Sequence, residues 1–247
     1  MPATPTIVLV HGAWADASSW TAVITRLQAS GRTVVALPNT LRGVGADAAV
    51  IRSYLDTVEG PVILVGHSYG GFVITNAATG AQNVKALVYV DAFIPDEGQP
   101  VAALTGEASA LAAAAANPTA LFKLVPIPGA PPQVADTYLL PSVIAESFAN
   151  GLSAEDQALI HASQRPASFA AVVEPSGPPA WKDIPSWAIV GTQDRIIVPS
   201  SLRAMAEHAG ATITEVDASH VSMVSHPDVV VGVIEQALSA VGESLPG

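Results

Sequence analysis

Apolar runs of strand length alternate along the chain with longer segments in which apolar residues recur at helical spacing. The runs are rich in β-branched residues and are separated by helices, so they predict parallel strands buried on both faces. They span residues 6–12, 33–39, 61–67, 84–92, 186–193 and 212–219. The helical segments between and after them span residues 19–29, 46–58, 68–79, 200–209 and 227–241.

Six strands with helices between them predict an α/β fold, with a mostly parallel six-stranded sheet covered by helices on both faces. The rhythm fails after the fourth strand, where an alanine run at 112–116 and repeated prolines replace it. We expect a helical insertion there that lies over the strand ends as a lid. The predicted core comprises residues 1–95 and 185–247, and the predicted insertion comprises residues 96–184.

The composition and charge of the chain limit its fold class and the kinds of molecule that it can bind. Half of the 247 residues are apolar and 13% are charged, which is typical of one globular domain. The formal charge of −11 would repel nucleic acid and anionic membrane surfaces. The absence of cysteine excludes disulfides, thiolate metal sites and cysteine nucleophiles.

No apolar segment approaches the roughly 20 residues that a membrane span needs, and the first residues lack a basic signal region, so we expect a cytoplasmic protein. A homodimer is compatible with this composition.

The motif G-x-S-x-G occurs at Gly66, Ser68 and Gly70, between the third strand and the helix that follows it. A serine at the tip of such a turn adopts a strained backbone with φ above zero, and side chains two residues away would collide with the neighbouring strand. The hydroxyl then projects from the carboxyl edge of the sheet, where ligands bind, and the N–H of Tyr69 can receive negative charge. A glycine-rich turn with an incidental serine is the alternative. The sequence lacks G-K-[ST] and, after the first two strands, G-x-G-x-x-G, which excludes phosphate and dinucleotide loops.

A serine nucleophile needs a base, and His220 follows the last strand at the same predicted edge. The other candidates have simpler roles as helix-end, surface or packed residues. His226 precedes a proline at a helix start, His208 ends a helix, His161 belongs to the insertion, and His67 is expected to point away from the site.

The base needs an orienting acid, for which Asp194 follows the fifth strand at the cleft edge. The chain order Ser68, Asp194, His220 is the order that an elbow fold requires. Asp91 ends the fourth strand and is the main rival. Asp217 and Asp183 are more simply structural or capping residues.

A second oxyanion donor is expected in the loop after the first strand. His11 and Gly12 would turn the chain there, so that the N–H of Ala13 joins that of Tyr69. We assign Trp14 to the substrate pocket, with a position in the core as the alternative.

These residues lie in the motifs "VLVHGAW", "ALP" and "LVGHSYGG". Through them the chain resembles the α/β-hydrolase superfamily, and within it the group of plant methyl-ester esterases, hydroxynitrile lyases and bacterial carboxylesterases. The likeness covers residues 5–95 and about 185–243 and is weak in the insertion. It implies the nucleophile, acid, base and oxyanion amides named above, in agreement with the residues themselves.

Two departures within this group favour ester hydrolysis. Cyanohydrin-cleaving members usually carry threonine in place of Gly12 and lysine in place of Val221, and the related dehalogenases and epoxide hydrolases carry aspartate in place of Ser68. We therefore expect a serine carboxylesterase for small, uncharged, partly hydrophobic esters that needs neither a metal nor an organic cofactor. Its alternatives are lactone hydrolysis, peracid formation or amide cleavage by the same residues, and a non-catalytic receptor for a small ligand. The apolar residues that suggest this substrate are Leu104, Leu121, Phe122, Leu124 and Leu140 of the insertion.

Overall fold

Six parallel strands form the central sheet of the computed structural model, which describes residues 4–115, 117–131 and 134–244. Their order across the sheet is β2-β1-β3-β4-β8-β9, and every neighbouring pair is parallel. The predicted fold class and the six strand positions are confirmed. The strands span Thr6–Val10 (β1), Thr33–Leu37 (β2), Val62–His67 (β3), Val84–Val90 (β4), Ser186–Gly191 (β8) and Thr212–Val216 (β9).

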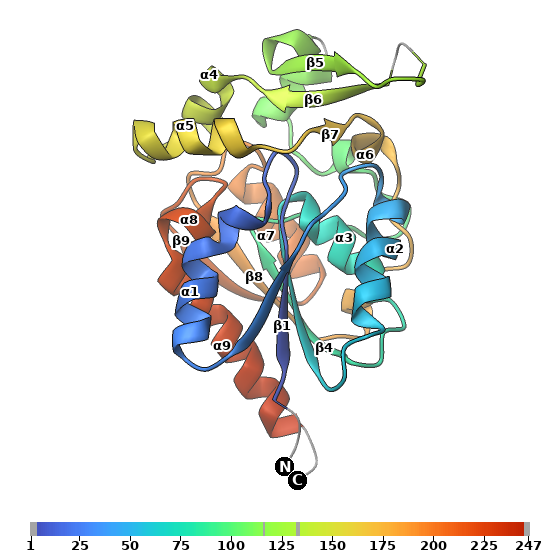
Figure 1. Ribbon diagram of the computed structural model, residues 1–247, viewed down its shortest axis with the longest axis vertical. Coiled ribbons are helices and arrows are strands. Elements are labelled where there is room, and N and C mark those ends of the chain that lie inside the picture. The colour runs from blue at the N-terminus through green and yellow to red at the C-terminus, as the bar shows by residue number, and fades with distance from the viewer. Residues whose placement is uncertain (1–3, 116, 132–133, 245–247) are drawn as a thin grey trace.

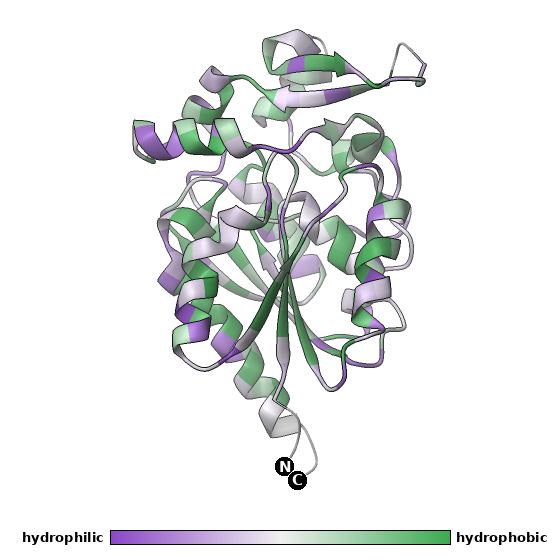
Figure 2. Cartoon of the chain, in the orientation of Figure 1, coloured by the Kyte–Doolittle hydropathy of each residue, from purple (hydrophilic) through white to green (hydrophobic). Residues whose placement is uncertain are grey.

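The inner strands β1 and β3 are almost wholly apolar because the sheet is covered on both faces. Every residue of β3 is buried, and the strands of the sheet are coloured as hydrophobic in Figure 2. Leu64 on β3 pairs with Val8 on β1 and with Leu87 on β4. The residue that follows β3 is therefore held at the middle of the sheet's carboxyl edge.

Helices cover both faces of the sheet (Figure 1). Helices α1 (Thr21–Ala29) and α9 (Pro227–Ser244) contact each other on one face, and α2 (Val44–Leu55) and α3 (Tyr69–Ala77) contact each other on the other. Right-handed crossovers place α7 (Pro199–His208) on the same side as α3. None of the helices in the described ranges is long and apolar enough to cross a membrane.

Residues between β4 and β8 lie across the carboxyl edge of the sheet, above the core in Figure 1. Within them a small antiparallel sheet has the order β5-β6-β7. Its strands span Phe122–Pro126, Ala135–Leu139 and Ala167–Ser168, and the α-helices around it span Pro141–Val143 (α4), Ala154–Ser163 (α5) and Ala170–Val173 (α6). Shorter helical turns span Val101–Ala103, Ala110–Ala115, Pro118–Ala120, Ile144–Phe148 and Ala180–Lys182, and α8 near the C-terminus spans Ser222–Ser225.

The prediction of a helical insertion is incomplete, because the insertion contains this three-stranded sheet. Each of its strands has five residues or fewer, which is too short for a polar–apolar period to stand out from the flanking prolines. The alanine run forms a 3₁₀ helix over Ala110–Ala115, and Ala116 lies outside the described residues. The exact limits of core and insertion stay a prediction.

Candidate active site

The turn between β3 and α3 holds Ser68 in the strained backbone expected from the motif, with φ 51° and ψ −122°. A Cβ added at Gly66 would lie 2.6 Å from the Gly70 carbonyl oxygen, and one added at Gly70 would lie 2.5 Å from the Val10 carbonyl oxygen. The predicted steric reason for the two glycines is therefore confirmed. Their lack of side chains lets the turn press against β1 and project Ser68.

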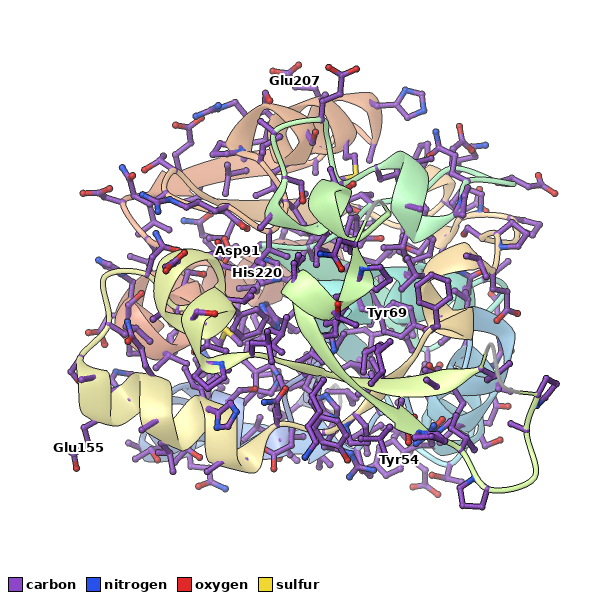
Figure 3. The ribbon with its side chains drawn as sticks, turned by 90° about the horizontal axis from the view of Figure 1, so that it is seen from above. Tyr54, Tyr69, Asp91, Glu155, Glu207 and His220 are labelled. Atoms are coloured by element: carbon purple, nitrogen blue, oxygen red, sulfur yellow. The ribbon has the colours of Figure 1, made fainter. Side chains whose placement is uncertain are left out.

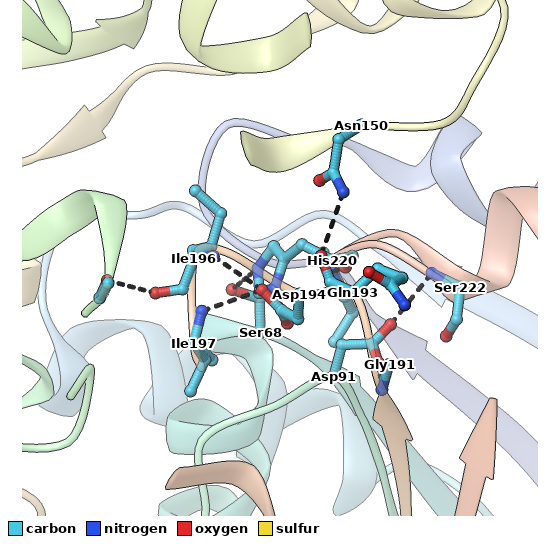
Figure 4. Close-up of polar contacts among 12 residues, drawn as sticks. Ser68, Asp91, Asn150, Gly191, Gln193, Asp194, Ile196, Ile197, His220 and Ser222 are labelled. Atoms are coloured by element: carbon cyan, nitrogen blue, oxygen red, sulfur yellow. Dashed lines mark hydrogen bonds and ion pairs between the residues drawn. The ribbon is translucent and has the colours of Figure 1, made fainter. Parts of the chain in front are cut away.

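Three side chains from distant parts of the chain form one hydrogen-bonded row (Figure 4). Nε2 of His220 lies 2.7 Å from Oγ of Ser68, and Nδ1 of His220 lies 2.7 Å from Oδ2 of Asp194. All three residues are buried, and the ring of His220 has no exposed surface. The structure thus brings together the predicted nucleophile, base and acid.

The Asp194 carboxylate is oriented by its own loop. Its Oδ1 accepts hydrogen bonds from the N–H groups of Ile196 and Ile197 at 2.8 and 3.0 Å, which leaves Oδ2 for His220. Asn150 of the insertion donates to the Gln193 carbonyl at 3.1 Å (Figure 4). The acid is thereby held from the core side and from the insertion side.

The rival acid Asp91 lies beside His220 beneath the insertion (Figure 3) but has different partners. Its two carboxylate oxygens accept the N–H groups of Gly191 at 2.8 Å and Ser222 at 3.0 Å. Burial, together with the nearby charge of Asp194, raises the pKa of Asp91 to about 7. Asp91 therefore fastens the end of β8 and the segment after His220 to β4, while Asp194 meets the imidazole.

His67 supports the backbone of His220. Its Nε2–H donates to the His220 carbonyl at 2.8 Å, and the ring of Phe148 from the insertion packs against both imidazoles. Burial lowers the pKa of His67 well below its usual value, so the ring stays neutral. The predicted packed role of His67 agrees with its position.

The other histidines lie outside this row. His208 contacts Asp96, His226 contacts Ser225 at the start of α9, and His161 lies on the exposed side of α5.

The loop after β1 approaches Ser68 closely. A Cβ on Gly12 would lie 2.7 Å from the Cβ of Ser68, and Ala13 lines the same cavity as Ser68 and Tyr69. Within the described part of the chain, the N–H groups of Ala13 and Tyr69 have no hydrogen-bond acceptor. They are therefore free to bind an oxyanion beside Ser68.

A neutral His11 fixes this loop from below. Its Nε2 accepts the N–H of Asn39 at 2.8 Å, and its Nδ1–H donates to the Gly12 carbonyl at 2.9 Å. Burial lowers the pKa of His11, which favours the neutral ring that this pattern requires.

A cavity of about 440 Å³ opens from Ser68 between the core and the insertion. Trp14 lines it, as predicted, together with residues that the sequence did not single out. Among the five insertion residues noted for their apolar character, Phe122 alone lines it, and Leu124 is exposed. The lining is almost entirely apolar, and Glu107 is its one charged side chain among the described residues.

Of the lining residues that were not predicted from the sequence, some carry a sequence signal and others do not. Phe93 lies two positions beyond Asp91 at a strand's carboxyl end, which is a usable sequence signal. Thr137, Phe169 and Val172 come from short elements of the insertion and carry no such signal.

The phenol of Tyr69 lies against α2. It donates to Oδ2 of Asp47 at 2.9 Å, and burial together with this carboxylate raises the pKa of Tyr69 above its usual range. The phenol therefore stays protonated and acts as a donor that holds Tyr69, the residue after Ser68, in place.

Comparison with known proteins first gives a family match over most of the chain. A family model described as "Alpha/beta hydrolase family" matches residues 7–233.

Two curated relatives match shorter segments. The carbendazim hydrolyzing esterase of Nocardioides sp. (strain SG-4G) is 39% identical over 116 residues, which cover 41% of this chain and 47% of the relative. Methylesterase 8 of Arabidopsis thaliana is 32% identical over 103 residues, which cover 36% of this chain and 38% of the relative. Each match thus spans less than half the length of the relative.

Solved structures share the whole architecture. A variant of tomato Methylketone Synthase I, complexed with beta-ketoheptanoate, superposes with a TM-score of 0.77 over 96% of this chain and 99% of that chain. Its sequence identity is 20%, so the likeness shows the fold.

The contact of Gly70 with β1 predicts a large effect of Gly70→Ala. The added methyl group would meet the backbone oxygen of Val10 at 2.5 Å, and neither backbone can move freely. We expect the free energy of unfolding to fall by about 2–3 kcal/mol, measured by chemical denaturation. The matched control is Gly232→Ala in α9, where an added Cβ meets no atom within 4 Å. The control should raise stability by about 0.5–1 kcal/mol, and equal effects at both positions would contradict the steric argument.

The neutral state of His67 predicts a pH-dependent stability term. The unfolded chain takes up this proton near pH 6.5 and the folded chain does not, so the contribution is present above that pH and is lost below it. In His67→Gln the side chain keeps a donor for the His220 carbonyl but cannot titrate. From about pH 7.5 to about pH 5.5, the free energy of unfolding of the wild type should fall by about 1.4 kcal/mol more than that of the variant. His161→Gln on α5 is the control, and parallel pH profiles for wild type and His67→Gln would exclude this term.

Proposed function

Because the chain belongs to the alpha/beta hydrolase family, we propose that it is a serine esterase that cleaves small, uncharged, partly hydrophobic carboxylic esters. The observation that carries the proposal is the buried row of Ser68, His220 and Asp194 at the floor of an apolar cavity. This row supplies a nucleophile, a base and an orienting acid in the order that the fold requires.

In the proposed acylation step, Oγ of Ser68 attacks the ester carbonyl while Nε2 of His220 takes the hydroxyl proton. The two atoms are already 2.7 Å apart, so the proton moves along an existing hydrogen bond. Asp194, bonded to Nδ1, holds the ring tautomer and stabilises the imidazolium. The tetrahedral intermediate collapses when His220 returns the proton to the departing alkoxide, and an acyl-enzyme remains.

The oxyanion that forms at the ester carbonyl would be bound by the N–H groups of Ala13 and Tyr69. Both residues line the cavity next to Ser68, and Tyr69 begins α3, whose N-terminal partial charge is positive. Each such donor contributes about 2.7–4 kcal/mol of transition-state stabilisation.

Water completes the cycle. His220 removes a proton from a water molecule that attacks the acyl carbonyl, and it then returns the proton to Oγ of Ser68 as the acid leaves. Every proton transfer in this scheme passes through one imidazole, so neither a metal nor an organic cofactor takes part.

The cavity supports the proposed substrate class. Its walls are mainly alanine, valine and aromatic side chains, and the one charged group, Glu107, would repel an anionic ester. Two relatives are named for carbendazim and for methyl esters, so carbendazim and methyl esters belong in the substrate screen beside p-nitrophenyl esters. Lactones, anilides and hydrogen peroxide would rank the alternative reactions of the same residues.

Active-site labelling tests the nucleophile. A fluorophosphonate should modify Ser68, identified by peptide mass analysis, because the serine is activated by its hydrogen bond to His220. Ser68→Ala should abolish labelling, and His220→Ala should lower kcat for p-nitrophenyl acetate by about 10⁴-fold or more. Labelling at another serine, or full activity of Ser68→Ala, would refute the proposal.

A pair of isosteric substitutions distinguishes the two buried carboxylates. Asp194→Asn removes the charged partner of Nδ1 and disfavours the required tautomer, so kcat should fall by about 10⁴-fold. Asp91→Asn leaves the hydrogen bond between Asp194 and His220 in place, but it places an amide opposite two backbone N–H donors. We therefore expect kcat to fall far less, by about 10-fold, and the free energy of unfolding to decrease. A greater loss of kcat in Asp91→Asn would identify Asp91 as the orienting acid.

A further inference from the structure

Trp14 has a backbone conformation that its own loop does not explain. Its φ is 56°, in the left-handed region that a bulky residue rarely adopts, and its side chain is buried. Such a conformation is strained and persists where surrounding contacts determine it. The contacts that hold Trp14 therefore indicate the role of this loop.

Those contacts come from two strands of the insertion's sheet, β5 and β6, and the second of them is joined in turn to β7. The indole Nε1–H donates to Oγ1 of Thr137 on β6 at 3.0 Å, and the hydroxyl of Thr137 donates onward to the carbonyl of Ala167 on β7 at 2.8 Å. The indole also stacks on Phe122 of β5, with ring centroids 5.3 Å apart and an angle of 27° between planes. Because the Thr137 proton is committed to Ala167, a lone pair of the hydroxyl faces the indole.

The insertion's sheet is itself fastened to the core by separate contacts. The N–H of Ser168 on β7 donates to the Leu41 carbonyl at 2.9 Å, and Arg42 forms an ion pair with Asp136 on β6. Asp136 and Ser168 are direct partners across β6 and β7, and Thr137 is the next residue on β6, paired with Ala167. It is therefore a fixed anchor for the indole.

Ala13 is held between two such restraints. On one side Gly12 is pressed against Ser68, and its carbonyl accepts the Nδ1–H of His11. On the other side Trp14 is clamped by the insertion. The direction of the Ala13 N–H depends on the chain between these two points, and a displacement of about 1 Å in such a group can cost about 10²-fold in rate.

We infer that the Trp14–Thr137 hydrogen bond is a positioning device through which the insertion sets the Ala13 oxyanion donor. The inference rests on the proposed serine-esterase function and extends it. Trp14 and Thr137 act through Ala13 and not on the reacting atoms, so they govern stabilisation of the tetrahedral oxyanion more than substrate binding.

The test uses Trp14→Phe, which removes the indole donor, and Thr137→Val, which removes the acceptor at constant shape. With p-nitrophenyl acetate, each variant should lose about 10-fold in kcat, with KM changed by less than about twofold. The double variant should lose no more than about 10-fold, because both changes break one hydrogen bond. Thr137→Ser keeps the hydroxyl and should recover most of the lost rate.

A matched pair of inhibitors distinguishes positioning of the Ala13 oxyanion donor from a role of Trp14 as a wall of the pocket only. Ser68 adds to the carbonyl of 1,1,1-trifluoro-2-octanone, its proton passes to His220, and the carbonyl oxygen becomes an oxyanion in the Ala13–Tyr69 site. The ketone 2-octanone binds without this charge. Both single variants should weaken the fluorinated inhibitor by about 10-fold and leave 2-octanone within about twofold. Equal weakening of the two ketones would overturn the inference and make Trp14 a pocket wall only.

Two controls keep the outcomes distinct. Trp181→Phe removes another indole hydrogen bond, to the Pro95 carbonyl at 2.8 Å, away from the cavity lining, and should leave kcat within about twofold of wild type. Thermal melting checks that each variant is folded. Suppose that Ser68 is labelled and the wild type cleaves esters. If the single variants then have the kcat of the wild type, or if the double variant loses about 100-fold in kcat, this inference alone fails. If the wild type is neither labelled nor active, the proposed function fails and the inference fails with it.

Discussion

The contact between the turn at Ser68 and the end of β1 is the constraint on which the rest of the structure depends. Gly70 lies so close to the Val10 carbonyl that no side chain fits between them, and Gly12 lies similarly close to Ser68. This approach places Ser68, Ala13 and Tyr69 around the same cavity. The parallel sheet makes it possible, because β1 and β3 are neighbours that end at the same edge.

Strain is concentrated along that edge. Among the described residues, the non-glycine positions with positive φ are Trp14, Leu41, Ser68 and Asp91, and they follow the ends of β1, β2, β3 and β4 respectively. Three of the four are held by contacts from elsewhere: Trp14 by the insertion, Leu41 through the Ser168 N–H, and Asp91 through two backbone donors. The tightly packed sheet below them offsets the cost of this strain. The site is thus a strained edge that the insertion covers (Figure 1).

The two buried carboxylates near His220, those of Asp194 and Asp91, have different hydrogen-bond partners. Asp194 accepts two N–H groups with one oxygen and meets the imidazole with the other, whereas both oxygens of Asp91 are engaged by backbone donors. Burial beside Asp194 raises the pKa of Asp91 to about 7. A second full charge next to the first is costly in such surroundings. Asp194 is therefore the carboxylate that keeps its charge beside the imidazole, and Asp91 fastens backbone.

The sequence by itself determined the six-stranded sheet, the strained turn at Ser68 and the set of candidate partners, because burial on both faces and the glycine spacing are local signals. The tertiary structure decided which aspartate meets His220, that the insertion carries a sheet, and that Thr137 holds Trp14. Asp91 and Asp194 both follow strands at one edge, so their spacing along the chain does not distinguish them. The insertion's strands are short, and the hydrogen bond between Trp14 and Thr137 joins residues that lie 123 positions apart. Pairings of that kind depend on how the chain packs in space, and no local pattern records them.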